Sequence, residues 1–158
     1  MSRFKMYVVI PVRPHVRQYL EQNIFLKKKG FVLTSTSTVG SFLMKLVEPK
    51  KKALLPLRYN PDNTIQVLLT DNYNFVVRPY LSPQKADQFN LFVERKLKEE
   101  MYVFIDCMCR YCGKDINQAI AEFQNKYGFN DNDLSFDLCK QSYFRYRKAL
   151  KSRNGKAA

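Results

Sequence analysis

Apolar residues recur at helical spacing in a segment near the end of the chain. Steps of three and four residues separate them, which places them on one face of a helix. They are Ile116, Ala119, Ile120, Phe123 and Tyr127. Gln118, Glu122, Gln124 and Lys126 fall outside this stripe and are expected to face water. Gly128 follows the last apolar position, where a glycine commonly ends a helix.

A second helical pattern follows after a short polar turn. The run Asn130-Asp131-Asn132-Asp133 offers side-chain oxygens that cap the first amides of a helix, which is expected to begin near Leu134. Its predicted buried stripe has a 3-4-3-4 spacing and consists of Phe136, Cys139, Tyr143, Tyr146 and Leu150. Two helices joined in this way predict a helix-turn-helix-like structure over residues 115–151.

The other side of this second helix is basic. Lys140, Phe144, Arg147, Lys148 and Lys151 fall on the outward side, with Gln141 and Arg145 at its margins. Arg and Lys neutralise phosphates and donate to guanine, Gln pairs with adenine, and Phe contacts the thymine methyl group or a sugar. The sequence therefore predicts that these seven residues bind DNA. The alternative is a solvated amphipathic face with no partner.

The charge of the chain favours a polyanionic partner. The formal net charge is +13, with a pI near 9.7. Residues 134–158 hold seven Lys/Arg and one Asp, whereas residues 114–133 hold two Lys and four acids. A field of this sign concentrates nucleic acid before any specific contact forms. An anionic membrane surface is the competing polyanion, but no apolar run approaches the roughly 20 residues that span a bilayer.

The N-terminal part alternates predicted strands and helices. Strands are predicted at Lys5–Val12 and Phe31–Ser35, and a hairpin at Thr64–Thr70 and Tyr73–Pro79. Helices are predicted from Pro14 to about Ile24 and from Ser37 or Thr38 to Pro49. In the first of these helices Val16, Tyr19, Leu20 and Asn23 share the predicted buried side. This pattern indicates a small sheet with two helices packed on it.

Two lysine triplets make the N-terminal part strongly basic. They are Lys27-Lys28-Lys29 and Lys50-Lys51-Lys52, and residues 1–58 hold twelve Lys/Arg against two Glu. If these segments meet DNA, we expect them to hold phosphates, which positions a protein without reading base sequence. The alternative is that lysine runs serve only solubility.

A long helix is predicted between the two parts. Ser82 is placed to cap it and Pro83 to occupy its first turn, and the pattern continues to about Cys112. The chain is thus expected to be α+β, with an N-terminal lobe at 1–81 and a helical lobe at 82–158. In the second lobe the long helix would be the first of a three-helix bundle.

The cysteines and the single histidine offer little chemistry. Cys107, Cys109 and Cys112, with Cys139 or His15, could supply four zinc ligands. The first two point to different faces of the predicted helix, so the cysteines are expected to be buried or half-buried small residues and no metal or cofactor is predicted. Neither a nucleophile elbow, an HExxH motif nor a paired-carboxylate signature is present, which predicts a protein that is not an enzyme.

Two segments resemble small uncharacterised proteins of mobile elements and phages from Bacteroides-type bacteria: KMYVVIPVRPHVRQYL and DLSFDLCKQSYFRYRK. The resemblance implies a role in regulating or processing such an element. We therefore expect a cytoplasmic, duplex-DNA-binding regulator or architectural factor. A structural or adaptor protein that binds an acidic partner protein is one alternative, and an RNA-binding protein whose aromatic residues stack on bases is another.

Overall fold

A computed structural model describes residues 6–23, 26–27, 30–33, 36–49, 64–69 and 79–154. The fold is α+β, as predicted, and the described strands all lie in the N-terminal part. Contacts between residues divide the chain into two compact units, Met1–Val93 and Glu94–Ala158. Each unit has its own set of buried apolar side chains.

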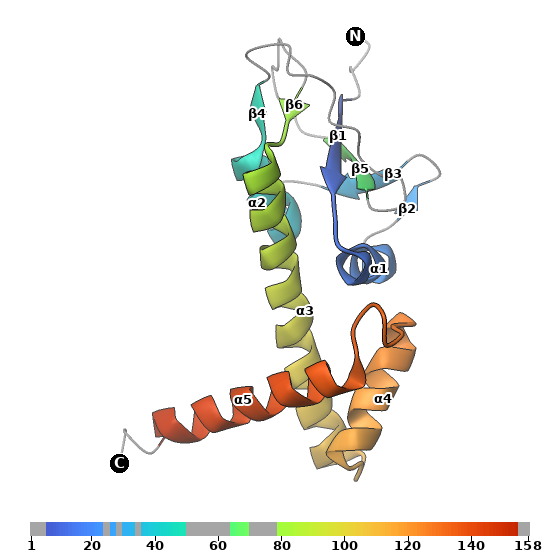
Figure 1. Ribbon diagram of the computed structural model, residues 1–158, viewed down its shortest axis with the longest axis vertical. Coiled ribbons are helices and arrows are strands. Elements are labelled where there is room, and N and C mark those ends of the chain that lie inside the picture. The colour runs from blue at the N-terminus through green and yellow to red at the C-terminus, as the bar shows by residue number, and fades with distance from the viewer. Residues whose placement is uncertain are drawn as a thin grey trace. The chain divides into compact units, whose positions relative to one another are not determined.

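The first unit is built on a four-stranded mixed sheet (Figure 1). Its strands are β1 (Met6–Pro11), β2 (Leu26–Lys27), β3 (Gly30–Leu33) and β5 (Thr64–Leu69). They lie in the order β1-β5-β3-β2, with β5 antiparallel to β1 and parallel to β3. The strand β5 is therefore central, although it comes last of the four in the sequence.

One face of this sheet is buried. In β1, Val8 and Ile10 are buried, whereas Tyr7 and Val9, which alternate with them, are exposed. Val8 lies opposite Val67 of β5 in the register, and Val67 is also fully buried. Successive side chains of a strand point to opposite faces of the sheet, so every second residue of β1 lies on the core side.

The predicted hairpin after β5 does not form. Leu68 and Leu69 pair with β1 on one side and with β3 on the other. With both edges occupied, β5 is not one arm of a hairpin with the chain that follows it. The predicted second arm lies mostly outside the described residues, except that β6 (Pro79–Tyr80) pairs with β4 (Glu48–Pro49) in a separate two-stranded sheet.

Two helices add to the core of the first unit. In α1 (Pro14–Asn23) the buried residues are Val16, Tyr19 and Leu20, as predicted. Asn23 was also predicted to be buried but is exposed. Its side-chain amide donates to the carbonyl of Tyr19 at 3.0 Å near the helix end. In α2 (Thr38–Leu46), the hydroxyl of Ser37 accepts the amide of Gly40 at 3.0 Å and confirms the predicted cap.

The long helix α3 (Pro83–Tyr111) belongs to both units. Its first turns pack in the first unit, where the buried Asn90 accepts the amide of Arg13 and donates to the carbonyl of Pro11, each at 2.9 Å. Because these turns help to complete the first unit, the division falls at 93/94 inside the helix. The sequence pattern had placed it before the helix, at 81/82.

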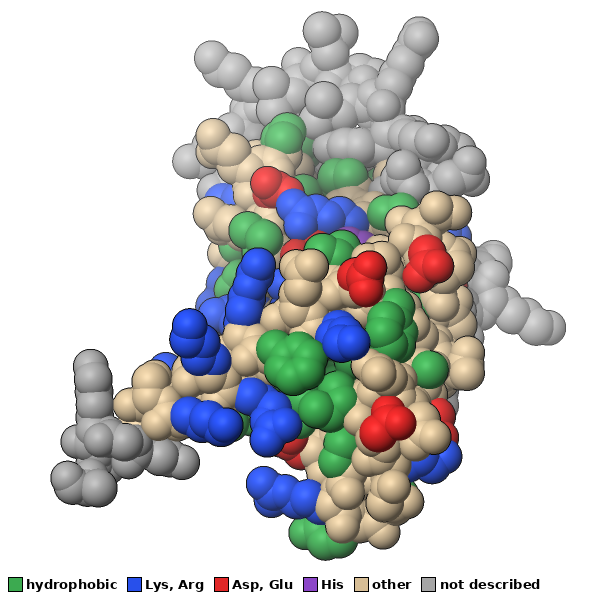
Figure 2. Space-filling view, turned by 60° about the horizontal axis from the view of Figure 1, so that its bottom comes forward, with side chains coloured by type: hydrophobic (Ala, Val, Ile, Leu, Met, Phe, Trp, Pro, Cys, Tyr) green, Lys and Arg blue, Asp and Glu red, His purple; other side chains and the backbone are tan. Residues whose placement is uncertain are grey.

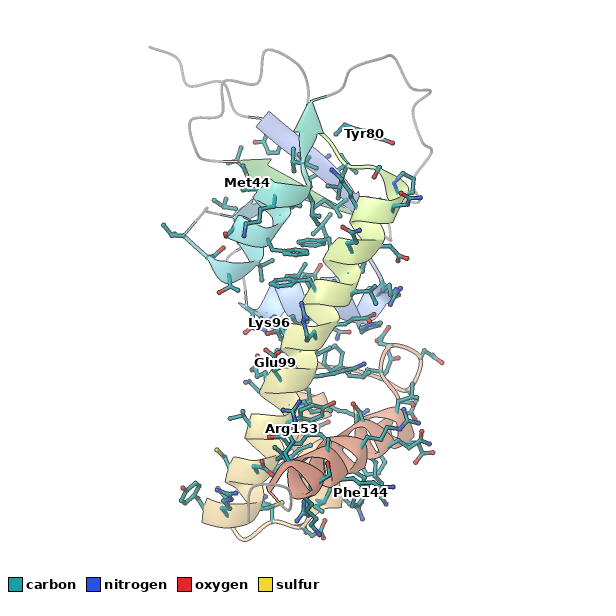
Figure 3. The ribbon with its side chains drawn as sticks, turned by 90° about the vertical axis from the view of Figure 1, so that its left-hand side faces the viewer. Met44, Tyr80, Lys96, Glu99, Phe144 and Arg153 are labelled. Atoms are coloured by element: carbon teal, nitrogen blue, oxygen red, sulfur yellow. The ribbon has the colours of Figure 1, made fainter. Side chains whose placement is uncertain are left out.

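The second unit consists of the rest of α3 with α4 (Ile116–Tyr127) and α5 (Phe136–Asn154). Its core combines residues from all three helices and the α4–α5 turn, and α5 runs across the end of α3 rather than along it (Figures 1 and 3). The buried side chains are Leu97, Met101, Ile105, Ala119, Ile120, Phe123, Tyr127, Phe129, Cys139 and Tyr143.

Both ends of α4 are fixed by local interactions. Asp115 accepts the amide of Gln118, and Gln118 accepts the amide of Asp115, which is a complete capping box. At the other end Gly128 has φ 66° and ψ 26°, a left-handed conformation that glycine adopts without strain. The predicted end of this helix is confirmed.

The polar turn between the helices agrees with the prediction in one contact, in which Asp131 accepts the amide of Phe136 at 3.4 Å, and differs from it in the others. Asn130 accepts the amides of Asn132 and Asp133 with its side chain, so the acidic run forms a turn of its own. The helix α5 begins at Phe136 rather than near Leu134, after Ser135 accepts the amide of Leu138 at 3.3 Å.

Gln124 of α4 is buried, although it was predicted to face water. Its side-chain amide donates to the carbonyl of Leu134 at 2.7 Å, which joins α4 to the end of the turn. A buried polar group of this kind is stabilised by its hydrogen bond. The periodicity of α4 could not predict this burial, because the partner, the carbonyl of Leu134, lies outside the helix.

Candidate nucleic-acid interface

The helix α5 is anchored by a few specific contacts. Cys139 and Tyr143 are buried, while Phe136 and Tyr146 are half-buried. Leu150 was predicted to be buried, but it is 37% exposed. The predicted stripe is therefore correct for the first half of α5, and the second half extends past the core.

Tyr143 makes the central anchoring contact. Its hydroxyl donates to Oδ1 of Asp106 on α3 at 2.5 Å. Burial, followed by the hydrogen bond to the Asp106 carboxylate, raises the pKa of Tyr143 well above its usual range. Tyr143 therefore keeps its proton and remains a donor to Asp106. Burial likewise raises the pKa of the Cys139 thiol to about 11, so this cysteine stays neutral in the core.

A second contact lies beside the first. The rings of Tyr102 on α3 and Tyr146 on α5 are stacked with centroids 4.3 Å apart. The hydroxyl groups of Tyr102 and Ser142 share a hydrogen bond at 2.5 Å. Together with Tyr143, these contacts fix the rotation of α5 about its own axis, so the opposite side is presented in one orientation.

The side of α5 that faces solvent is the predicted basic surface. Gln141, Phe144, Arg145, Arg147, Lys148 and Lys151 are exposed, and Lys140 is half-buried. Figure 2 shows Lys and Arg side chains gathered along the arm that leads to the C-terminal tail, next to hydrophobic side chains. Phe144, which is 46% exposed, and Arg153 both come from this helix (Figure 3). We call these eight residues the α5 basic face.

The composition of this face is one-sided. Asp137, in the first turn, is the sole acid of α5. An acid at that position stabilises the helix through the partial positive charge of its N-terminus. From Lys140 onward the exposed charges of α5 are therefore all positive.

An open groove of about 560 Å³ adjoins the basic face in the second unit. It is formed by the end of α3, the beginning of α4 and the second half of α5. Its lining includes four cationic side chains, Arg110, Lys114, Arg147 and Lys151. Arg147 also lies over the ring of Tyr143, with its guanidinium carbon 6.0 Å from the ring centroid.

Arg110, Lys114 and Arg153 were not among the binding residues predicted from the sequence. Arg110 lies at the end of the long helix and Lys114 in the connection to α4, and neither belongs to a run of basic residues in the sequence. Their position beside α5 depends on the packing of three helices. Arg153 had a sequence signal, because it continues the basic run of the last helix.

The acids of the groove are engaged within the protein. Asp106 accepts the Tyr143 hydroxyl, and Asp115 caps α4. Lys114 pairs with Glu122 of α4, and this hydrogen bond raises the pKa of Lys114. Lys114 consequently stays charged, while its pairing with Glu122 reduces its attraction for an outside anion.

The structure bears little on the N-terminal lysine triplets. Lys27 is the last residue of β2, and only its backbone is described. Lys28, Lys29 and Lys50-Lys51-Lys52 lie outside the described residues. Their contact with phosphates stays a prediction.

The cysteines differ from the sequence expectation. Cys107 and Cys112 are exposed, Cys109 is half-buried and Cys139 is buried. Cys107 points away from the core on α3, and Cys112 follows the last residue of that helix, so neither is packed. Within the described part of the chain, no three His, Cys, Asp or Glu side chains are arranged to hold a metal ion.

Two further observations bear on the class of protein. Among the described residues, no helix is long and apolar enough to cross a membrane. Comparisons with known protein families, with curated proteins and with solved structures give no match. The features of the second unit that bear on function are the α5 basic face and the groove beside it.

Proposed function

We propose that the protein binds double-stranded DNA through the α5 basic face. In this proposal α4 and α5 act as a helix-turn-helix, and the last turns of α3 complete a three-helix bundle behind them. The second helix of such a pair commonly enters the major groove. The observation that carries the proposal is the anchoring of α5 by Tyr143 and Tyr102, which leaves a cationic and aromatic side facing solvent.

The side chains of this face suit different parts of a duplex. Arg147, Lys148 and Lys151 would neutralise phosphates, since Lys151 follows Lys148 by three residues and Arg147 by four and therefore lies next to both on the surface of α5. Gln141 and Arg145 carry donors that distinguish base edges in the major groove. Phe144 offers an apolar contact to a thymine methyl group or a sugar.

A regulatory or architectural role follows from this binding mode. The resemblance of residues 5–20 and 133–148 to proteins of mobile elements and phages supports a function on such an element. The lysine triplets would add affinity that is independent of base sequence, since contacts to phosphates position a protein without reading the bases.

Charge reversal on α5 tests the proposal. The double variant Arg147→Glu/Lys148→Glu should bind a duplex about a hundredfold more weakly at low salt, because each lost contact costs about 1–3 kcal/mol. Fluorescence anisotropy with labelled duplexes of defined and random sequence measures the change. Circular dichroism of the variant checks that the fold is retained.

Lys45→Glu/Lys98→Glu is the matched control. Lys45 and Lys98 are exposed, lie on α2 and α3 and do not belong to the α5 basic face, and the net charge changes by the same amount. We expect this control to lose only the small part of affinity that depends on total charge. Equal losses in the two double variants would refute the assignment to α5. Stronger binding of single-stranded RNA than of duplex DNA would support the RNA-binding alternative.

A further inference from the structure

The groove beside α5 has the dimensions of a small-ligand site. Its volume of about 560 Å³ falls within the range of roughly 300–1,000 Å³ that is typical of ligand pockets. Three separate elements form it, so the groove is a product of the packed second unit. A single bound phosphate would fill only a small part of this volume.

The groove combines apolar and cationic parts. Ile116, Leu150 and the ring of Tyr143 supply apolar surface, and four cations surround it. Neither Arg110 nor Lys151 has an ion-pair partner among the residues that the structure describes. In Figure 2, Lys and Arg side chains stand on the α5 arm and also across the gap from it.

The two acids of the lining, Asp106 and Asp115, offset only half of this charge, so that four cations and two acids leave a formal net charge of +2 in the groove. Asp106 already accepts a hydrogen bond from Tyr143, and Asp115 is used by the α4 capping box. Two arginines, Arg110 on α3 and Arg147 on α5, present planar guanidinium groups from different elements. Guanidinium groups bind phosphate oxygens in pairs, with stronger and more directional hydrogen bonds than neutral donors make.

We infer that this groove binds a phosphate monoester that carries a ring, of the mononucleotide class. The phosphate lies between Arg110, Arg147 and Lys151, and the ring lies against the apolar side formed by Ile116 and Leu150. An anion without a ring would use only the cationic part of the groove. A neutral nucleoside would use only the apolar part.

This site has a consequence for the α5 basic face. Arg147 and Lys151 belong both to the groove and to the face proposed to bind DNA. A bound mononucleotide would therefore compete with duplex DNA for these two side chains. The inference itself does not rest on the proposed function, because nucleotide binding is measured without DNA.

Isothermal titration calorimetry of the full chain at low salt tests the site. Adenosine monophosphate should bind with one-to-one stoichiometry, inorganic phosphate more weakly, and adenosine not measurably. Arg110→Glu should weaken the binding of adenosine monophosphate by about tenfold or more, since a charged hydrogen bond is lost and a repulsive charge is added. Arg110→Gln, which removes the guanidinium without adding a negative charge, should give a smaller loss in the same direction.

Lys98→Glu is the matched control on the same helix. Lys98 is exposed, carries the same charge as Arg110 and does not line the groove. We expect its affinity for adenosine monophosphate to stay within about twofold of the unmodified chain. Equal weakening by Arg110→Glu and Lys98→Glu would overturn the inference, and so would the lack of saturable binding. Loss of duplex binding in Arg147→Glu/Lys148→Glu remains a separate result that tests the proposed function alone.

Discussion

The helices α4 and α5 are neighbours in one unit, yet they differ in what they do with their surfaces. Five of the 12 residues of α4 are buried, and they extend over its whole length. In α5, which has 19 residues, the fully packed positions are Cys139 and Tyr143, near its beginning. The shorter helix contributes mainly to the core, whereas the longer helix is attached at one end and exposes the rest.

Their charged residues differ in the same way. Glu122 and Lys126 of α4 form ion pairs with Lys114 and Glu100. Arg145, Lys148 and Lys151 of α5 have no ion-pair partner within the described ranges. The charged residues of α4 are thus paired within the unit, whereas the positive charge of α5 is left exposed to solvent.

Truncation of Phe123, a large core residue of α4, should have the greatest effect on stability. Phe123 is fully buried and contacts the rings of Phe104, Tyr127 and Phe129. Phe123→Ala should lower the free energy of unfolding of the second unit by about 3–5 kcal/mol, because it creates a cavity. Urea denaturation followed by circular dichroism measures this change.

Phe144→Ala is the matched change on α5. Phe144 is 46% exposed, so the free energy of unfolding should change by less than about 0.5 kcal/mol. Its effect should instead appear as weaker binding of duplex DNA. If the two alanine variants destabilised the unit equally, the contrast between the helices would be wrong.

An effect on stability between those of Phe123→Ala and Phe144→Ala is expected from the contact that anchors α5. Tyr143→Phe keeps the buried ring and removes the hydroxyl that donates to Asp106. A hydrogen bond to a charged group contributes about 1.5–3 kcal/mol, so the loss of stability should lie in that range. Thermal unfolding measures it, and amide hydrogen exchange should show faster exchange in α5 than in α4. An unchanged melting temperature would show that this bond does not hold α5 in place.

Features that depend on local sequence were predicted correctly. The C-terminal end of α4 was predicted from a glycine directly after the last apolar position, as Gly128 shows. The caps of α2 and α3 at Ser37 and Ser82 also depend on local sequence. The exposed side of α5 was also predicted, because the periodicity of a helix fixes which residues share a face.

Features that depend on distant partners were missed. The burial of Gln124 depends on the carbonyl of Leu134, and the burial of Asn90 depends on the backbone at Pro11 and Arg13. The central position of β5 depends on strands far from it in the sequence, so a hairpin was predicted instead. The groove was missed for the same reason, since its lining comes from three helices.

The most direct test of the central claim is to map the DNA-binding surface by nuclear magnetic resonance. Titration of the ¹⁵N-labelled full chain with a short duplex should shift the amide signals of α5 between Lys140 and Lys151. Signals of the buried stretch of α4 around Phe123 should move much less. Shifts confined to the first unit, with α5 unchanged, would contradict the proposal that the α5 basic face binds DNA.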